Sequence, residues 1–236
     1  MTGASAVAVR SVVLTRVSDL LARAEHPGVR LPHPDRLRAE AGAGVDRILY
    51  VAHRDLHVRT VAQGPDAGRV WRGDLVCYTG GSLANGEPVR SIGHWNTPGQ
   101  TEIFQVQSGR VVMVVALPGE PQWLSAAEYT AGEVCAVPAG AFHLTYAPGE
   151  AATVYNIYTD PEQAEGERAG KYAGLRAPDY AFGQRPTQPG PVPVPQRAPI
   201  PEDLVDALAV ASDRQLTDLR HAIDHAQHDG WPRRPR

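Results

Sequence analysis

The chain has 236 residues, a formal net charge of −3 and only two cysteines, Cys77 and Cys135. A nearly balanced charge gives no electrostatic basis for binding nucleic acid or an anionic membrane, so we expect neither as a partner. Both cysteines lie in apolar, strand-like runs, which indicates buried free thiols and a reducing cytoplasm. No apolar run approaches the roughly 20 residues that cross a bilayer, and the N-terminal one is too short for a signal sequence. These features favour a cytoplasmic protein with one domain of ordinary size plus an appendage.

The first 44 residues are predicted to form a helical extension. Apolar residues recur at three- and four-residue spacing over 6–25, which is typical of an amphipathic helix, and Pro27-Gly28 ends the pattern. A second short helix is expected over 34–41, because a proline begins it and a glycine follows it.

From about residue 45 to 175 the pattern changes to short runs of β-branched and aromatic residues, separated by glycine and proline clusters. The predicted strands lie at 48–51, 57–61, 75–78, 103–106, 111–115, 134–137 and 153–158. Short strands at this spacing are typical of a sandwich or barrel and not of alternating βαβ units.

The remaining sequence divides into two parts. Residues 176–201 are predicted to form a stiff, polyproline-like linker or surface strap, since seven prolines fall between 185 and 201. Residues 202–236 are predicted to hold a helix over 202–227 and a short tail. That helix carries an apolar stripe made by Leu204, Leu208, Leu216, Leu219 and Ile223.

Two sequence segments carry residues of metal-binding type. The first is Gly93-His94-Trp95-Asn96 followed by Glu102, and the second runs from Gly132 to His143. Because side chains alternate along a strand, His94 and Asn96 are expected to point the same way.

We expect Glu102 on the neighbouring strand, across a turn at Pro98-Gly99. The tight turn after Pro138 would place the His143 imidazole over the same face.

Two imidazoles and a carboxylate on one face form a set suited to one divalent ion, Fe, Mn, Zn or Ni, with positions left open for water or substrate. The predicted ligands are therefore His94, Glu102 and His143, with Asn96 beside them. Three roles are open to Asn96: a weak ligand, a group that orients a bound water, or a residue that only shapes the pocket.

The same two segments match the paired motifs of the cupin superfamily. The region 45–175 resembles the cupin-type phosphoglucose (glucose-6-phosphate) isomerases of archaea and some bacteria. The likeness rests on Gly93-His94, Glu102-Ile103-Phe104, Trp123-x-Ser125, Gly132 through His143, and Ile157-Tyr158. It implies an all-β fold, the cupin double-stranded β-helix (jelly-roll barrel), to which this chain adds N- and C-terminal helical extensions. It also implies a homodimer.

The resemblance assigns further roles. It implies that Glu102 is the base that moves a proton between two substrate carbons, and that Ser91, Phe104 and Tyr158 lie near the substrate. Phe104 stands where the family has a tyrosine, and Asn96 stands where it has a second histidine. These departures remove polar groups from the pocket and indicate a relative that has moved to another substrate, for example in secondary metabolism.

Three functions follow from these residues. The first is a metal-dependent isomerase of a sugar-phosphate-like or other hydroxy-carbonyl small molecule, in which Glu102 transfers the proton. The second is a non-haem Fe(II) oxygenase, because two histidines and one carboxylate are the ligand set of that class. The third is a cupin that binds a small polar ligand without catalysis.

Overall fold

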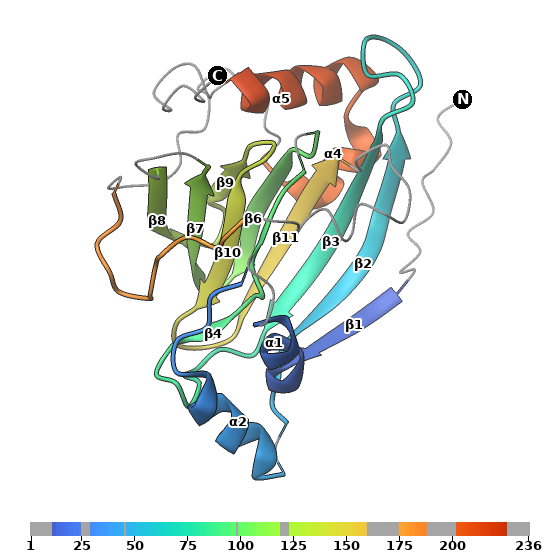
Figure 1. Cartoon of the computed structure of the whole chain (residues 1–236). Coiled ribbons are helices and arrows are strands. Elements are labelled where there is room, and N and C mark those ends of the chain that lie inside the picture. The colour runs from blue at the N-terminus through green and yellow to red at the C-terminus, as the bar shows by residue number, and fades with distance from the viewer. Residues whose placement is uncertain are drawn as a thin grey trace.

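The computed structural model describes residues 11–24, 29–44, 46–97, 99–118, 123–159, 175–187 and 202–225. Two antiparallel sheets face each other and enclose the main apolar core (Figure 1). Helices α1 (Val17–Arg23) and α2 (Pro34–Gly42) lie at one end of the sandwich, and α5 (Asp213–His225) lies across the other end. The predicted all-β fold with helical extensions at both ends is confirmed.

The larger sheet has the strand order β1-β2-β3-β11-β6-β9. These strands are β1 (Ser11–Arg16), β2 (Ile48–Thr60), β3 (Val70–Tyr78), β6 (Glu102–Ser108), β9 (Val134–Val137) and β11 (Ala152–Thr159). The smaller sheet has the order β4-β10-β7-β8, with β5 also paired to β10. Its strands are β4 (Val89–Arg90), β5 (His94–Trp95), β7 (Arg110–Leu117), β8 (Trp123–Thr130) and β10 (Phe142–Ala147).

Strands far apart in the sequence pair in both sheets, as β3 does with β11 and β4 with β10, which is the jelly-roll arrangement. Among the described residues, no strand pairing joins the two sheets into one closed barrel. The expected barrel is therefore a sandwich of two sheets.

The N-terminal helix predicted over 6–25 is wrong in part. Residues Ser11–Arg16 form β1, which pairs antiparallel with β2, and helix begins only at Val17. Val12 and Val13 are β-branched, and the edge of β2 supplies hydrogen-bond partners that an isolated helix would lack. Residues 1–10 lie outside the described residues. The second predicted helix is confirmed as α2.

The strands predicted at 48–51 and 57–61 are one long strand, β2. Its pairing with β3 shifts register between His53 and His57, where Asp55 has a positive φ of 56°. A bulge thus lies between the two predicted segments. The other predicted strands are confirmed, and β5 is the strand expected at His94. Strands β1, β4, β8 and β10 were not predicted.

Alternate residues of β6 and β11 face opposite sides of the larger sheet. Phe104 and Val154 point into the core between the sheets, while Ile103 and Ile157 point outward into a second apolar cluster. Helix α4 (Leu204–Val210) packs on this outer face, and apolar residues of α5 belong to the same cluster. Their apolar stripe is buried, with at most 2% exposure at Leu204, Leu208, Leu216, Leu219 and Ile223.

The single helix predicted over 202–227 is wrong, because the chain breaks into α4 and α5. Ala211 is extended with ψ 141°. Ser212 then starts α5 through a reciprocal pair of bonds, in which its amide donates to Gln215 Oε1 at 2.8 Å and its Oγ accepts from the Gln215 amide at 3.3 Å.

The predicted proline-rich strap lies mostly outside the described residues. Its described part runs against the smaller sheet, where Thr187 Oγ1 accepts from the Leu124 amide at 2.8 Å and Trp95 Nε1 donates to the Arg176 carbonyl at 3.2 Å. Both cysteines are free, Cys135 buried and Cys77 only partly so. None of the described helices has the length and apolarity needed to span a membrane.

Candidate metal centre

Strands β5 and β10 hold the two histidines side by side. His94 and His143 are direct partners in the antiparallel register, and their Nε2 atoms are 3.2 Å apart. The loops that flank them are tied together, because the Asn96 amide donates to the Ala141 carbonyl at 2.8 Å. Both imidazoles therefore present the same ring nitrogen to one point.

A glycine immediately before His94 permits this close approach. Gly93 has a φ of 77°, and a Cβ at this position would meet Phe142 Cζ at 3.0 Å. Any other residue would strain the backbone and push against β10. The glycine of the first motif thus has a steric role in placing the histidine.

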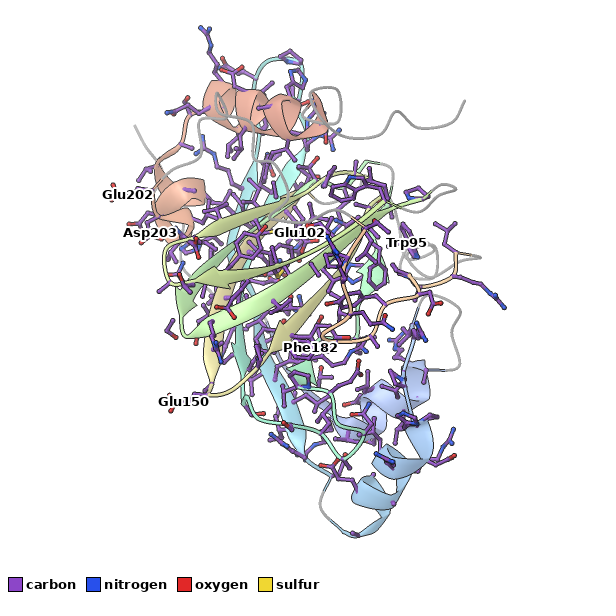
Figure 2. All side chains as sticks on the ribbon, turned by 90° about the vertical axis from the view of Figure 1, so that its left-hand side faces the viewer. Trp95, Glu102, Glu150, Phe182, Glu202 and Asp203 are labelled. Carbon is purple, nitrogen blue, oxygen red and sulfur yellow. The ribbon has the colours of Figure 1, made fainter. Side chains whose placement is uncertain are left out.

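The position expected for Glu102 was wrong. Glu102 does not lie on a strand next to His94 across the Pro98-Gly99 turn. It begins β6 in the larger sheet and faces the histidines from across the sandwich. The chain crosses between the sheets after β5 instead of reversing as a hairpin. Figure 2 shows Glu102 in the middle of the sandwich, whereas Glu150 and Glu202 lie at its periphery.

Two amides hold the Glu102 carboxylate. Asn156 Nδ2 donates to Oε1 at 2.8 Å, and Asn96 Nδ2 donates to Oε2 at 3.2 Å. Because an ionised carboxylate only accepts hydrogen bonds, each amide must turn its NH₂ group toward it. Both amide oxygens, Asn96 Oδ1 and Asn156 Oδ1, are consequently buried without a hydrogen-bond partner within the described residues.

Asn156 was not among the predicted site residues. The alternation of side chains along β11 could have indicated it. Asn156 and Tyr158 lie on the inner face of the sheet, whereas Tyr155 and Ile157 face outward. An amide at an inward position of a buried strand indicates a polar neighbour, here Glu102.

The three donor atoms fit one ion. His143 Nε2 lies 3.2 Å from both His94 Nε2 and Glu102 Oε2, and one donor atom of each residue lies within 4.8 Å of the other two. Ligand atoms that share an ion at about 2.0–2.2 Å are themselves about 3 Å apart. In the described part of the chain, no other group of three or more histidines, cysteines and carboxylates gathers in this way.

The second ring nitrogen of His143 departs from the usual pattern. A ligating histidine commonly donates its other N–H to an acceptor. His143 Nδ1 is buried and has no such partner among the described residues. Phe104, whose ring centroid lies 5.1 Å from that of His143, packs against the imidazole and holds it by contact.

The three predicted substrate residues take different places. Ser91 Oγ accepts from the Thr145 amide at 3.0 Å, so this hydroxyl holds β10 in place beside the histidines. Phe104 is 7% exposed and packs on His143. Tyr158 is the register partner of Glu102 on β11 and shares its inner face.

The hydroxyl of Tyr158 is held in its protonated form. Burial raises its pKa above the ordinary value, and the negative charges of Asp74, Asp55 and Glu102 add to this, while Arg54 opposes it. Tyr158 is therefore a hydrogen-bond donor at neutral pH, placed next to the candidate metal ligands.

Comparison with known proteins supports the cupin assignment. Residues 93–176 match the protein-family model described as Cupin. This match and the two facing antiparallel sheets give the chain a cupin fold, and they support placing this part of it in the cupin superfamily. No curated protein matches the chain.

Several solved structures resemble the chain at low identity. Oxalate decarboxylase from Bacillus subtilis at pH 4.6 has a TM-score of 0.36 and 15% identity, over 50% of this chain and 26% of its own. A formate complex of the Lactobacillus farciminis oxalate decarboxylase has a TM-score of 0.35 and 18% identity, and the match covers 50% of this chain and 30% of the decarboxylase. This chain thus spans under a third of these decarboxylases. A sugar phosphate isomerase of the cupin superfamily from Silicibacter pomeroyi has a TM-score of 0.33 and 18% identity, and the match covers 57% of this chain and 69% of the isomerase.

Proposed function

We propose that the protein is a metal-dependent cupin enzyme that isomerises a small hydroxy-carbonyl compound of sugar-phosphate type by proton transfer. The observation that carries this proposal is the Glu102 carboxylate, which is 5% exposed, held by amides on both oxygens, and aimed at the Nε2 atoms of two histidines. The two amide donors hold the carboxylate oxygens in a fixed direction.

The residues divide the work between holding an ion and moving a proton. His94, His143 and Oε2 of Glu102 would hold one divalent ion, Fe, Mn, Zn or Ni. The ion would supply Lewis-acid polarisation of the substrate carbonyl. We assign the transfer of the proton between the two carbons to Oε1 of Glu102, the oxygen that accepts from Asn156.

Tyr158 complements Glu102 in this scheme. Its raised pKa keeps the phenol protonated, so the hydroxyl can donate to the substrate oxygen on which negative charge develops. Because Tyr158 and Glu102 are register partners on one face, a substrate of a few carbons can contact both. Asn96 and Asn156 would keep the carboxylate in position while the substrate turns over.

The donor set also favours a second candidate. Two histidines and one carboxylate are the ligands of non-haem Fe(II) oxygenases, so an iron-dependent oxidation is compatible with the same three residues. A binding cupin without catalysis is the third candidate. The two enzymes differ in an observable way, because proton transfer exchanges substrate hydrogen with solvent and consumes no oxygen.

The test uses that difference. Protein loaded with each of the four metals is incubated in D₂O with glucose 6-phosphate, fructose 6-phosphate and smaller hydroxy-carbonyl compounds, and deuterium at the carbon next to the carbonyl is followed by NMR. We expect exchange that is lost in the Glu102→Gln variant. Oxygen uptake with iron and no exchange would favour the oxygenase, and neither signal with any metal would favour the binding protein.

A further inference from the structure

A row of polar residues that includes Glu102 runs along the inner face of the larger sheet. Glu102, Tyr158 and Arg72 are consecutive register partners on β6, β11 and β3. Partners in register point to the same side of a sheet. Since neighbouring strands are about 4.8 Å apart, the backbones of Glu102 and Arg72 are about 10 Å apart with Tyr158 between them.

A second arginine lies beside this row. Arg54 on β2 donates from Nη1 to Asp74 Oδ2 at 2.5 Å, and Asp74 on β3 is fully buried. The Arg54 side chain is 39% exposed. Within the described residues its hydrogen bond to Asp74 uses one of the guanidinium nitrogens, so Nε and Nη2 remain available to a ligand.

The bulge in β2 fixes the direction of both guanidinium groups. Asp55 accepts from Arg72 Nη1 at 2.8 Å, and its own amide donates to Asp74 Oδ1 at 2.8 Å. Asp55 has a left-handed φ of 56°, a conformation that costs free energy in a residue other than glycine. Bulges beside active sites redirect side chains. Here Asp55 of the bulge connects Arg72 to the buried Asp74 carboxylate, which also binds Arg54.

Tyr158 connects the arginines to the metal donors. Asp74, Asp55, Arg54 and Glu102 all act on the charge of its phenol, so its hydroxyl lies within electrostatic reach of both groups. Arg54, Arg72 and Tyr158 are each partly exposed, as is His94 on the facing sheet. Solvent therefore reaches part of each of these side chains.

We propose that Arg54 and Arg72 form an anion subsite, and that the small molecule held at His94, Glu102 and His143 carries a carboxylate or phosphate at its far end. The guanidinium fork binds both groups through paired, charge-assisted hydrogen bonds. Asp55 and Asp74 keep the forks oriented and offset their charge. The inference rests on the proposed metal site but not on the proposed isomerisation.

The experiment compares three chelators with the same metal-binding head and matched length: butyrohydroxamate, succinic acid monohydroxamate and 3-phosphonopropionohydroxamate. They differ only in a neutral, carboxylate or phosphonate tail. Binding to metal-loaded protein is measured by isothermal titration. We expect an anionic tail to improve affinity at least tenfold, and the tighter of the two anionic chelators identifies the anion that the subsite takes.

The variants remove the subsite and leave the metal donors in place. Arg72→Gln removes one guanidinium group. The double variant Arg54→Gln/Asp74→Asn removes the other while retaining a neutral hydrogen-bonding pair, because Arg54→Gln alone would strand a fully buried carboxylate. Each should reduce the anionic preference at least threefold and leave butyrohydroxamate affinity unchanged. Arg110→Gln, which breaks the exposed Arg110–Glu128 pair, is the matched control and should change neither quantity.

Two results would overturn the proposal. The first is equal affinity for all three chelators in the wild-type protein, or no binding of any of them. The second is an anionic preference that survives in both variants, which would mean that the arginines serve only the fold. Loss of isomerisation with the preference intact would reject the proposed function alone.

Discussion

Replacing Asn156 with leucine tests whether the buried amides serve the metal centre. Leucine has nearly the same volume but removes the donor to Glu102 Oε1, a bond of 2.8 Å at a side chain that is 3% exposed. A hydrogen bond to a charged group contributes about 1.5–3 kcal/mol. If that energy holds the carboxylate in its ligating position, metal affinity should fall about 10- to 100-fold, the range typical of residues that support metal ligands.

The matched control is Asn85→Leu. Asn85 is 6% exposed, and its Nδ2 donates to the Pro32 carbonyl at 3.0 Å and to Glu87 Oε2 at 3.3 Å, away from the metal donors. This variant should lose stability and retain metal affinity. Both proteins are titrated with Mn(II) and Zn(II) by calorimetry, and their free energies of unfolding are measured in urea.

An Asn156→Leu protein that binds metal within twofold of the wild type would refute this role of the amide. In that case the amide would serve the fold alone, as Asn85 does, and the position of Glu102 would be set by β6 without help. A loss of affinity in both variants would point to a general loosening of the sandwich.

Three further predictions follow from local geometry. Gly93→Ala should cost about 1–2 kcal/mol in urea unfolding and weaken metal binding, because the left-handed φ is strained and His94 must move with it. Burial would raise the pKa of Asp66, but its bonds to Arg220 and the neighbouring positive charges outweigh this and lower it. The ionised Asp66 therefore stabilises the fold fully above about pH 4, the ordinary pKa of an aspartate, and this stabilisation is lost as the pH falls through the lowered pKa of the folded state. The melting temperature of Asp66→Asn should accordingly fall less steeply with decreasing pH than that of the wild type. Burial raises the pKa of Cys135 to about 12, so a maleimide at pH 8 should leave this thiol unmodified until the protein is unfolded, as mass spectrometry of the peptides would show.

The two histidines were predictable because their evidence is local. The glycine before His94 and the turn before His143 fix backbone conformations that few residues adopt, and strand alternation fixes the faces. The strand runs rich in valine and isoleucine were predictable for the same reason.

The position of Glu102 was not predictable, because it depends on which sheet the chain enters after β5. A six-residue connection can form a hairpin or cross a sandwich, and only packing of the whole domain decides between them. The arginine pair was hidden for a related reason. Arg54 and Arg72 are ordinary surface residues in the sequence until the register of β2, the bulge at Asp55 and the strand order are known.

The start of the chain shows how tertiary pairing overrides periodicity. The apolar spacing over Ser11–Arg16 fits a helix, yet the segment pairs along β2 from Ser11 opposite Arg54 to Arg16 opposite Ile48. Strand pairing satisfies its backbone groups on one side, and its β-branched residues tolerate the extended conformation.

The central claim is that His94, Glu102 and His143 bind one metal ion. It is tested most directly by anomalous X-ray diffraction at the absorption edge of whichever metal the protein takes up, on wild-type crystals and on crystals of the His143→Ala variant. We expect one anomalous peak within about 2.0–2.2 Å of both imidazole Nε2 atoms and of Glu102 Oε2, and no peak there in the variant. A wild-type map without this peak, or with the metal bound elsewhere, would contradict the account.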